Sequence, residues 1–441
     1  MSSQLVVSRL ASRQASLMYA SGAQVNLFEN ESHAVLNPYN HDIKELSIQG
    51  QTPTAFNQSI IRWEVPKFED CWKQAFLSLT TAALGAPAGG DALVDHYGYV
   101  AFRRMYIQLT NNPYTAEFEV PYFMFDRHRL KYNSRQYLQY LNTGGYLIGT
   151  PLAARQAALQ NGHTALIDLE VGQSYEGFEN MFWISPLAHT LMIYAQLSNT
   201  TDIIDTNGSA VPGTSDWITA GNNFNTLITD VRLYASMITV DDDARASAMA
   251  IYNSDDGLYN FVREPRFWSF NLSPTAAVGG VVSLDMEETR PFTMMTIFYE
   301  CEDKVTTSYR RVPFDIQGPT MTDNALATVN WFNDFELVSL GGETIIKRRS
   351  VLHQRAMEHK WRFVDREAND WILNVPLSVY DPIKCNTING ALDPNVYNKI
   401  RLNLYYTGAV ATGGAGARVT VLFHAFNFIH NSHSDANKVI A

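Results

Sequence analysis

Two stretches of this 441-residue chain follow the same plan, a series of short aromatic-rich strand patterns separated by turns that contain Gly or Asn. The first covers residues 60–199 and the second covers residues 225–430. Few helical patterns lie between the strands, which is typical of sandwiches and jelly rolls rather than of alternating strand and helix units. The two stretches share this plan without sharing residue identity. We therefore predict an all-β protein with two tandem eight-stranded modules, a plan that favours a building block over a catalyst.

Alternation of apolar and polar residues marks the individual strands. In the first module we expect strands at residues 59–65, 75–81, 101–110, 164–171, 181–184 and 191–197. In the second we expect them at residues 227–238, 266–272, 281–285, 292–299, 331–340, 371–375, 400–406 and 419–428. Helical spacing over residues 122–142, and an acidic cap before residues 244–252, predict short helices in the loops.

Length and composition support two domains. A single hydrophobic core stops growing near about 250–300 residues, and 46% of the residues are hydrophobic. Asn, Thr, Asp, Gly and Pro dominate residues 198–225, which makes this segment the best linker. We predict an N-terminal arm at 1–24, a first jelly roll at 25–200, a linker at 201–224 and a second jelly roll at 225–441.

Charge argues against a chain that wraps nucleic acid. The net charge is −11, whereas phosphate binding requires Lys and Arg. Charged residues make up 17% of the chain, below the roughly 25% of ordinary soluble domains. Either other subunits cover much of the surface, or the chain is simply a large β protein. The basic run Lys347–Arg362 is expected to be a loop that pairs with acidic residues such as Asp365, Glu367 or Asp370.

The termini and cysteines bear on the compartment. Residues 4–20 have an amphipathic helical pattern that fits an arm lying on a surface, or a frayed terminus. The N-terminal residues lack the unbroken apolar stretch of a signal peptide, and no window has the length of a membrane span. Cys71, Cys301 and Cys385 have no metal-binding or disulfide spacing, so we expect buried free thiols in a reducing compartment.

Motifs that carry chemistry are missing, and we predict no catalytic, cofactor-binding or metal-binding residues. Asp241, Asp242 and Asp243 lack the ligand spacing of a calcium loop, so a helix cap is expected. His424, His430 and His433 are too far apart along a strand for one zinc ion and are expected to be packed or solvated. Glu287 and Glu288 are adjacent, so on a strand they point to opposite faces. The Gly-rich residues 413–416 predict a hairpin loop rather than a phosphate site.

Three segments resemble the double jelly-roll major capsid proteins of double-stranded DNA viruses. Tyr19–Gln24 is similar to that family's N-terminal motif after an amphipathic arm. Asp230–Arg245 resembles the long strand, acidic cap and helix that open the family's second jelly roll, and Thr420–Ile429 resembles its last strand. The order and length of the elements between them also agree. The aromatic and basic stretch that usually follows the first motif is missing, which leaves the virus group open, virophage-like and polinton-like relatives included.

The resemblance implies a structural protein of the virion. Members of the family form homotrimers with a six-sided outline that tile an icosahedral capsid beside neighbouring capsomers, minor capsid proteins and penton proteins. The N-terminal arm is then expected on the inner side, near minor capsid proteins or an internal membrane. Assembly is expected in the host cytoplasm or nucleus, without sequence-specific binding of nucleic acid. Subunit contacts are expected in loops such as Gly144–Gly149.

Two other classes stay open. A carbohydrate-binding or glycoside-processing β-sandwich protein would place two carboxylates about 5–10 Å apart in a cleft. A metal enzyme of two cupin-type barrels would need two His and a carboxylate on neighbouring strands, and the sequence has no His-x-His pattern.

Overall fold

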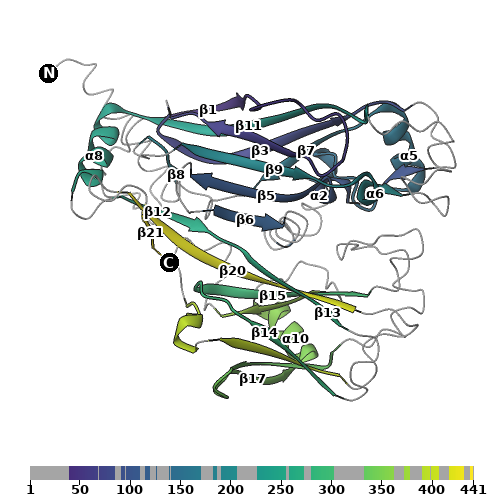
Figure 1. Ribbon diagram of the computed structural model, residues 1–441, viewed down its shortest axis with the longest axis vertical. Helices are drawn as coiled ribbons and strands as arrows, with labels where there is room; N and C mark the ends of the chain where they lie inside the picture. The colour runs from purple at the N-terminus through teal and green to yellow at the C-terminus, as the bar shows by residue number, and fades with distance from the viewer. Residues whose placement is uncertain are drawn as a thin grey trace, which may run out of the picture.

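The computed structural model describes most of the two strand-rich stretches. The described residues are 39–67, 69–84, 91–94, 96–109, 115–119, 126, 139, 141–169, 182–185, 190–205, 226–254, 258–272, 280–301, 332–361, 372–377, 390–397, 399–406, 417–431 and 438–440. The predicted N-terminal arm at 1–24 therefore lies outside the described residues. Two β modules lie side by side in the chain (Figure 1).

The first module has two antiparallel four-stranded sheets, in the orders β1-β11-β3-β7 and β2-β9-β5-β6, and the short β8 pairs with β3. Their strands are β1 (Tyr39–Leu46), β2 (Ile60–Val65), β3 (Cys71–Thr81), β5 (Phe102–Leu109), β6 (Thr115–Glu119), β7 (Thr164–Leu169), β8 (Phe182–Trp183), β9 (Leu191–Leu197) and β11 (Ile228–Val240). A separate two-stranded ladder joins β4 (Ala92–Leu93) to β10 (Ile204–Asp205).

The second module repeats this arrangement. One sheet has the order β13-β20-β15-β18, and the other has the order β14-β19-β16-β17. Their strands are β13 (Arg266–Leu272), β14 (Val281–Met286), β15 (Phe292–Cys301), β16 (Asp334–Ser339), β17 (Thr344–Ser350), β18 (Ile372–Pro376), β19 (Ile400–Tyr405) and β20 (Ala417–Asn431). Beyond β13 and β15, the long β20 also pairs with β12 (Leu258–Arg263) and β21 (Lys438–Ile440).

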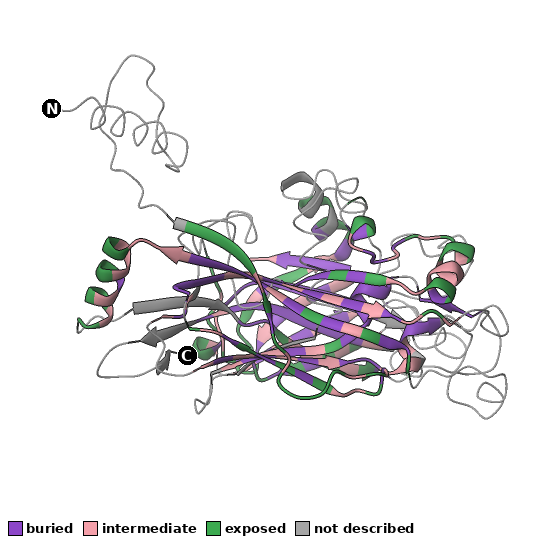
Figure 2. Ribbon diagram, turned by 90° about the horizontal axis from the view of Figure 1, so that it is seen from above, coloured by how far each residue is buried: buried purple, intermediate pink, exposed green. Residues whose placement is uncertain are grey.

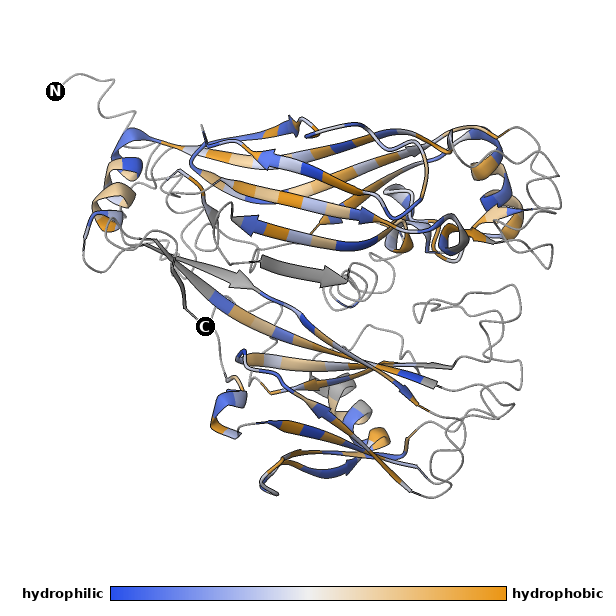
Figure 3. Cartoon of the chain, in the orientation of Figure 1, coloured by the Kyte–Doolittle hydropathy of each residue, from blue (hydrophilic) through white to orange (hydrophobic). Residues whose placement is uncertain are grey.

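Strand order identifies each module. In both, the first, eighth, third and sixth of the eight main strands form one sheet, and the second, seventh, fourth and fifth form the other. This is the order of an eight-stranded jelly roll, in which two Greek keys close a sandwich. The predicted fold class, an all-β chain with two tandem jelly rolls, is confirmed. The fold follows from alternation, because every second side chain of strands such as β2 and β9 is buried in the sandwich (Figures 2 and 3).

One predicted boundary is wrong. We expected β11 to open the second module, which was predicted to begin at residue 225. Instead β11 pairs with β1 and β3, and its inward residues Val231, Leu233 and Met237 belong to the first core. Alternation marks a strand correctly but cannot say which partners it pairs with, since pairing is set by residues far away in the chain. The expected linker is also partly structured, because α6 and β10 occupy residues 200–205, and residues 206–224 lie outside the described part.

Short helices lie between the strands, as predicted. They are α2 (Tyr97–Val100), α5 (Leu152–Asn161), α6 (Thr200–Ile203), α8 (Asp242–Tyr252), α10 (Val351–Trp361) and the 3-10 helix η5 (Pro394–Tyr397). Of the predicted helical segment 122–142, the described residues 126, 139, 141 and 142 are helical. The structure also has elements that the sequence patterns did not predict, among them β1, β6, β12, β17, α5 and α10.

Candidate functional site

The contact between the two jelly rolls buries the outer face of the β13-β20-β15-β18 sheet. The register places Phe267, Leu422, Thr296 and Asn374 in one row across the four strands. Leu422 packs, together with Phe298 and Ile372, in the core cluster of the first module. The opposite face of the same sheet closes the second core, so this sheet is buried on both sides. The core of the first roll therefore extends onto the outer face of this sheet of the second roll.

A polar cluster lies within this apolar contact. Asp126, from the segment between β6 and α5, reaches residues of β15 and β20. Its Oδ2 atom lies 2.9 Å from the Thr296 hydroxyl and 2.9 Å from His424 Nε2. Asn374 Oδ1 lies 3.0 Å from the same hydroxyl. All four residues are at most 4% exposed. A carboxylate can be buried here because two donors replace the water that it loses.

The cluster resembles a catalytic triad in composition but not in geometry. A triad base uses one ring nitrogen for the nucleophile and the other for the carboxylate. Here the Thr296 hydroxyl and the Asp126 carboxylate both contact the same atom, His424 Nε2, at 3.2 and 2.9 Å. The cluster is also buried, with no access for a substrate. It is suited to fixing one roll against the other rather than to chemistry.

Asp126 is the residue that the sequence patterns missed, because nothing local marks a carboxylate that is satisfied by residues so far away. His424 was expected to be packed or solvated, and it is packed. A signal for this existed in the sequence, since His424 stands in the mainly apolar run Val419–Phe426, of which the structure buries Val419–Ala425. A strand that is buried on both faces has such a run. The side chain of His430 and all of His433 lie outside the described part of the chain.

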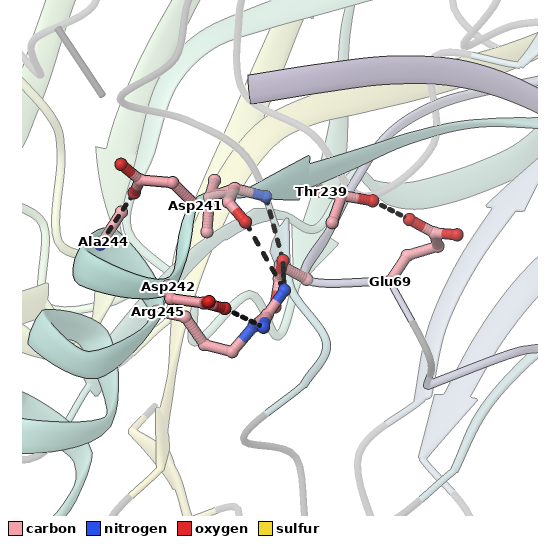
Figure 4. Close-up of polar contacts among 8 residues, drawn as sticks. Glu69, Thr239, Asp241, Asp242, Ala244 and Arg245 are labelled. Atoms are coloured by element: carbon pink, nitrogen blue, oxygen red, sulfur yellow. Dashed lines mark hydrogen bonds and ion pairs between the residues drawn. The ribbon is translucent and has the colours of Figure 1, made fainter. Parts of the chain in front are cut away.

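A second polar cluster fastens α8 to the first roll (Figure 4). Arg245 donates to both carboxylate oxygens of Asp70, at 2.8 and 3.0 Å, and to Asp242 at 2.9 Å. Asp70 also accepts from the backbone N–H of Val240, and Glu69 accepts from Thr239. Hydrogen bonding to Asp70 is the main cause that raises the pKa of Arg245. The cluster fixes the direction in which the chain leaves β11, at one end of the roll (Figure 2).

The acidic cap that precedes α8 is confirmed. The Asp241 side chain accepts a hydrogen bond of 2.9 Å from the backbone N–H of Ala244. This bond satisfies one of the free donors at the helix N-terminus. Within the described ranges, no group of three or more His, Cys, Asp or Glu side chains could hold a metal ion.

Glu287 and Glu288 follow the end of β14 and do not lie on a strand, but their environments are opposite. Glu287 is exposed and pairs with Lys399. Glu288 is buried, and it accepts from the indole N–H of Trp268 and from the backbone N–H groups of Thr289 and Arg290. A glycosidase pair must face an open cleft. Glu288 does not, because its residue is 1% exposed.

The basic run is not the loop that we expected. Residues 347–350 belong to β17, and residues 351–361 form α10. Arg348 pairs with Asp334 of the neighbouring strand β16 at 2.7 Å and lies 3.8 Å above the ring of Tyr405. The expected acidic partners Asp365, Glu367 and Asp370 lie outside the described residues. A strand with exposed basic side chains has the same composition as a solvated loop, which explains the error.

The remaining residues singled out in the sequence, where the structure describes them, take part in packing within their own roll. Gly144–Gly149 lies against β7 of its own roll, because Gly144 accepts from the N–H of Leu166 at 2.7 Å. Its expected role in subunit contacts stays a prediction. Cys71 is buried and free, and burial raises its pKa to about 12. The side chain of Cys301, Cys385 and residues 413–416 lie outside the described part. None of the described helices is long and apolar enough to cross a membrane.

Comparison with solved structures identifies the fold. VP54 of PBCV-1, fitted into a reconstruction of the virophage Sputnik, matches with a TM-score of 0.68 at 10% sequence identity over 94% of this chain and 100% of that chain. The Faustovirus major capsid protein matches with a TM-score of 0.64 at 9% identity over 98% and 99% of the two chains. This chain has the double jelly-roll fold of viral major capsid proteins.

The double jelly roll also matches the STIV major capsid protein, with a TM-score of 0.50 at 9% identity over 88% of this chain and 96% of that chain. No family model and no curated protein matches the sequence. The fold is therefore retained where sequence identity is lost. This fits the sequence pattern, because alternation and strand order, not particular residues, define the double jelly roll.

Proposed function

We propose that this protein is a major capsid protein, that its chains form homotrimers, and that the trimers tile the icosahedral shell of a double-stranded DNA virus. The observation that carries the proposal is the repetition of one strand order in two rolls that pack side by side. Three such chains would supply six similar units around one axis. A six-sided block of this kind can fill a hexagonal lattice from one gene product.

The contact between the rolls supports this role. A lattice block has to keep its two rolls in one relative orientation, because each roll takes the place of a separate subunit. An apolar face with a buried polar cluster meets that requirement, since burial supplies the stability and directional hydrogen bonds fix the register. The described polar clusters serve packing, which supports a building block rather than an enzyme.

The proposal also assigns partners and a location. Trimers would contact neighbouring trimers, minor capsid proteins and penton proteins in the virion capsid, after assembly in the host cell. The predicted arm at residues 1–24 would reach minor capsid proteins or an internal membrane at the inner side of the shell. The carbohydrate-processing alternative has no described cleft with paired carboxylates to favour it.

Measurement of the mass in solution tests the proposal. Light scattering on the purified chain should give three times the chain mass of 49.6 kDa. A monomer at all concentrations, particularly one that cleaves glycosides, would contradict it.

A further inference from the structure

Helix α8 is packed against the rolls along little of its length. It spans 11 residues, and Ala248 is the one buried residue of this fully described helix. Arg245 ties its first turn to Asp70, and the helix projects from one end of the molecule (Figure 2). A helix shorter than about 12–15 residues is marginal in water without packing, because packing supplies most of the stability of helices in proteins. This indicates a partner that the described parts of the two rolls do not supply.

The exposed half of α8 is partly apolar and partly acidic. Ala246, Ala250 and Ile251 lie on it, and Ile251 is 48% exposed. Asp242 and Asp243 lie on the same side, and the Asp242 side chain is 97% exposed. The anionic surface of a membrane repels such an acidic face. The face is instead complementary to a positively charged amphipathic segment.

The N-terminal arm supplies a segment of this kind. Its residues 4–20 have an amphipathic helical pattern, with Leu10 and Leu17 on the apolar side. Residues 1–28 contain two Arg and no Asp or Glu, which gives a side-chain charge of +2. Residues 241–254 contain three Asp and one Arg, which gives a charge of −2. The two segments are therefore matched in both charge and apolar character.

The arm is also tethered beside α8. β1 pairs antiparallel with β11, and Tyr39 lies opposite Val240, the residue before the helix cap Asp241. Because the strands are antiparallel, the chain enters β1 at the end of the sheet where it leaves β11 for α8. The connecting residues 21–38 can each extend by about 3.3 Å, so they can span the roughly 16 Å of α8. Tethering raises the effective concentration of a segment to about the millimolar range, so even a weak contact is populated.

We propose that residues 4–20 pack along the exposed face of α8 in the same chain. In this contact Leu10 and Leu17 cover Ile251, and the two Arg side chains of the arm face the acidic first turn of the helix. The inference goes beyond the proposed function, because the contact forms in the single chain before any assembly. The contact is autoinhibitory, since a minor capsid protein or a membrane that binds the arm has to displace it from α8.

Hydrogen exchange of the α8 amides measures whether the face is covered. The arm variant carries Leu10→Gln and Leu17→Gln, and the control carries Ser8→Gln and Ser12→Gln on the opposite side of the same helical pattern. Both variants leave the rolls and the net charge unchanged. We expect exchange in the last two turns of α8 to rise about 10-fold or more in the arm variant and to keep the wild-type rate in the control. Equal rates in all three proteins would overturn the proposal, as would equally faster exchange in both variants.

Cross-linking identifies the chain that supplies the arm. Leu17→Cys and Ile251→Cys are combined in one chain and treated with a short bismaleimide, and each single substitution controls for reaction of the native cysteines. We expect a cross-link within one chain, which keeps the single-chain mass on a denaturing gel and joins the two peptides in mass spectrometry. A product of twice the chain mass, in excess of the controls, would place the arm on another copy and overturn the proposal. Absence of any cross-link would overturn it too. The mass of the undenatured protein tests the proposed function separately.

Discussion

Asp126 Oδ2 lies 2.9 Å from His424 Nε2, although the two residues are 298 positions apart in the chain and belong to different jelly rolls. The pair sits in an otherwise apolar contact, with Thr296 as a common partner. Because the pair joins the two rolls, a substitution in it tests whether this contact fixes their relative orientation.

Asp126→Ala should lower the free energy of unfolding by about 3–5 kcal/mol, because it removes the buried carboxylate that Thr296 and His424 share as a partner. Urea denaturation measures the loss. Asp285→Asn provides the control, since Asp285 pairs with Arg401 on an exposed sheet face and exposed pairs contribute little. Equal effects of the two substitutions would mean that the buried cluster does not hold the rolls together.

Gly98→Ala tests the packing of the first core. A Cβ atom at residue 98 would lie 2.4 Å from the ring of Tyr146, whose hydroxyl accepts from the N–H of Asp168. Since the ring is fully buried, we expect a loss of about 1–3 kcal/mol, measured as a shift of the urea midpoint. Gly341→Ala is the matched control, because its nearest contact would be 3.5 Å, from Ser339 Oγ. A Gly98→Ala midpoint equal to that of the control would refute the account of this contact.

Asp241→Ala should destabilise the first turn of α8. Loss of the cap costs about 1 kcal/mol, and the cost should show as faster hydrogen exchange of the amides in the first turn, with Ala244 foremost. The comparison is Asp243→Ala, which also removes a first-turn carboxylate but leaves the Asp241 cap in place. If both variants exchange at the same rate, the effect is one of charge and not of the cap.

Stability should fall as the pH rises above about 9. Burial raises the pKa of the Cys71 thiol from 9.0 to about 12. In the folded chain the thiol keeps its proton, whereas in the unfolded chain it ionises above pH 9. Ionisation therefore stabilises the unfolded state relative to the folded state. One such group contributes a slope of about 1.4 kcal/mol per pH unit between pH 9 and 12. Burial also raises the pKa of Tyr97, which acts in the same direction.

Urea midpoints at several pH values measure this slope, with Cys71→Ala as the comparison. The variant should show a smaller fall than the wild type between pH 9 and 12. Parallel curves for the two proteins would rule out the thiol as a cause.

Local patterns predicted the strands well but not their partners. The alternating residues of β2, β9 and β11 marked three strands with bounds within a few residues. The membership of β11 in the first roll could not be predicted, because pairing with β1 joins residues nearly 200 positions apart. The residues of the buried polar cluster are even farther apart in the sequence, so local patterns could not bring them together. For His424 the sequence left a packed and a solvated side chain open, and the role of Asp126 could be seen only once the fold placed it beside Thr296.

Electron microscopy of the purified protein tests the central claim most directly. Class averages of single particles should show a six-sided outline made of three chains, with two rolls in each. Single chains without a common assembly, or particles with two-fold or four-fold symmetry, would contradict the account of this double jelly roll as a capsid building block.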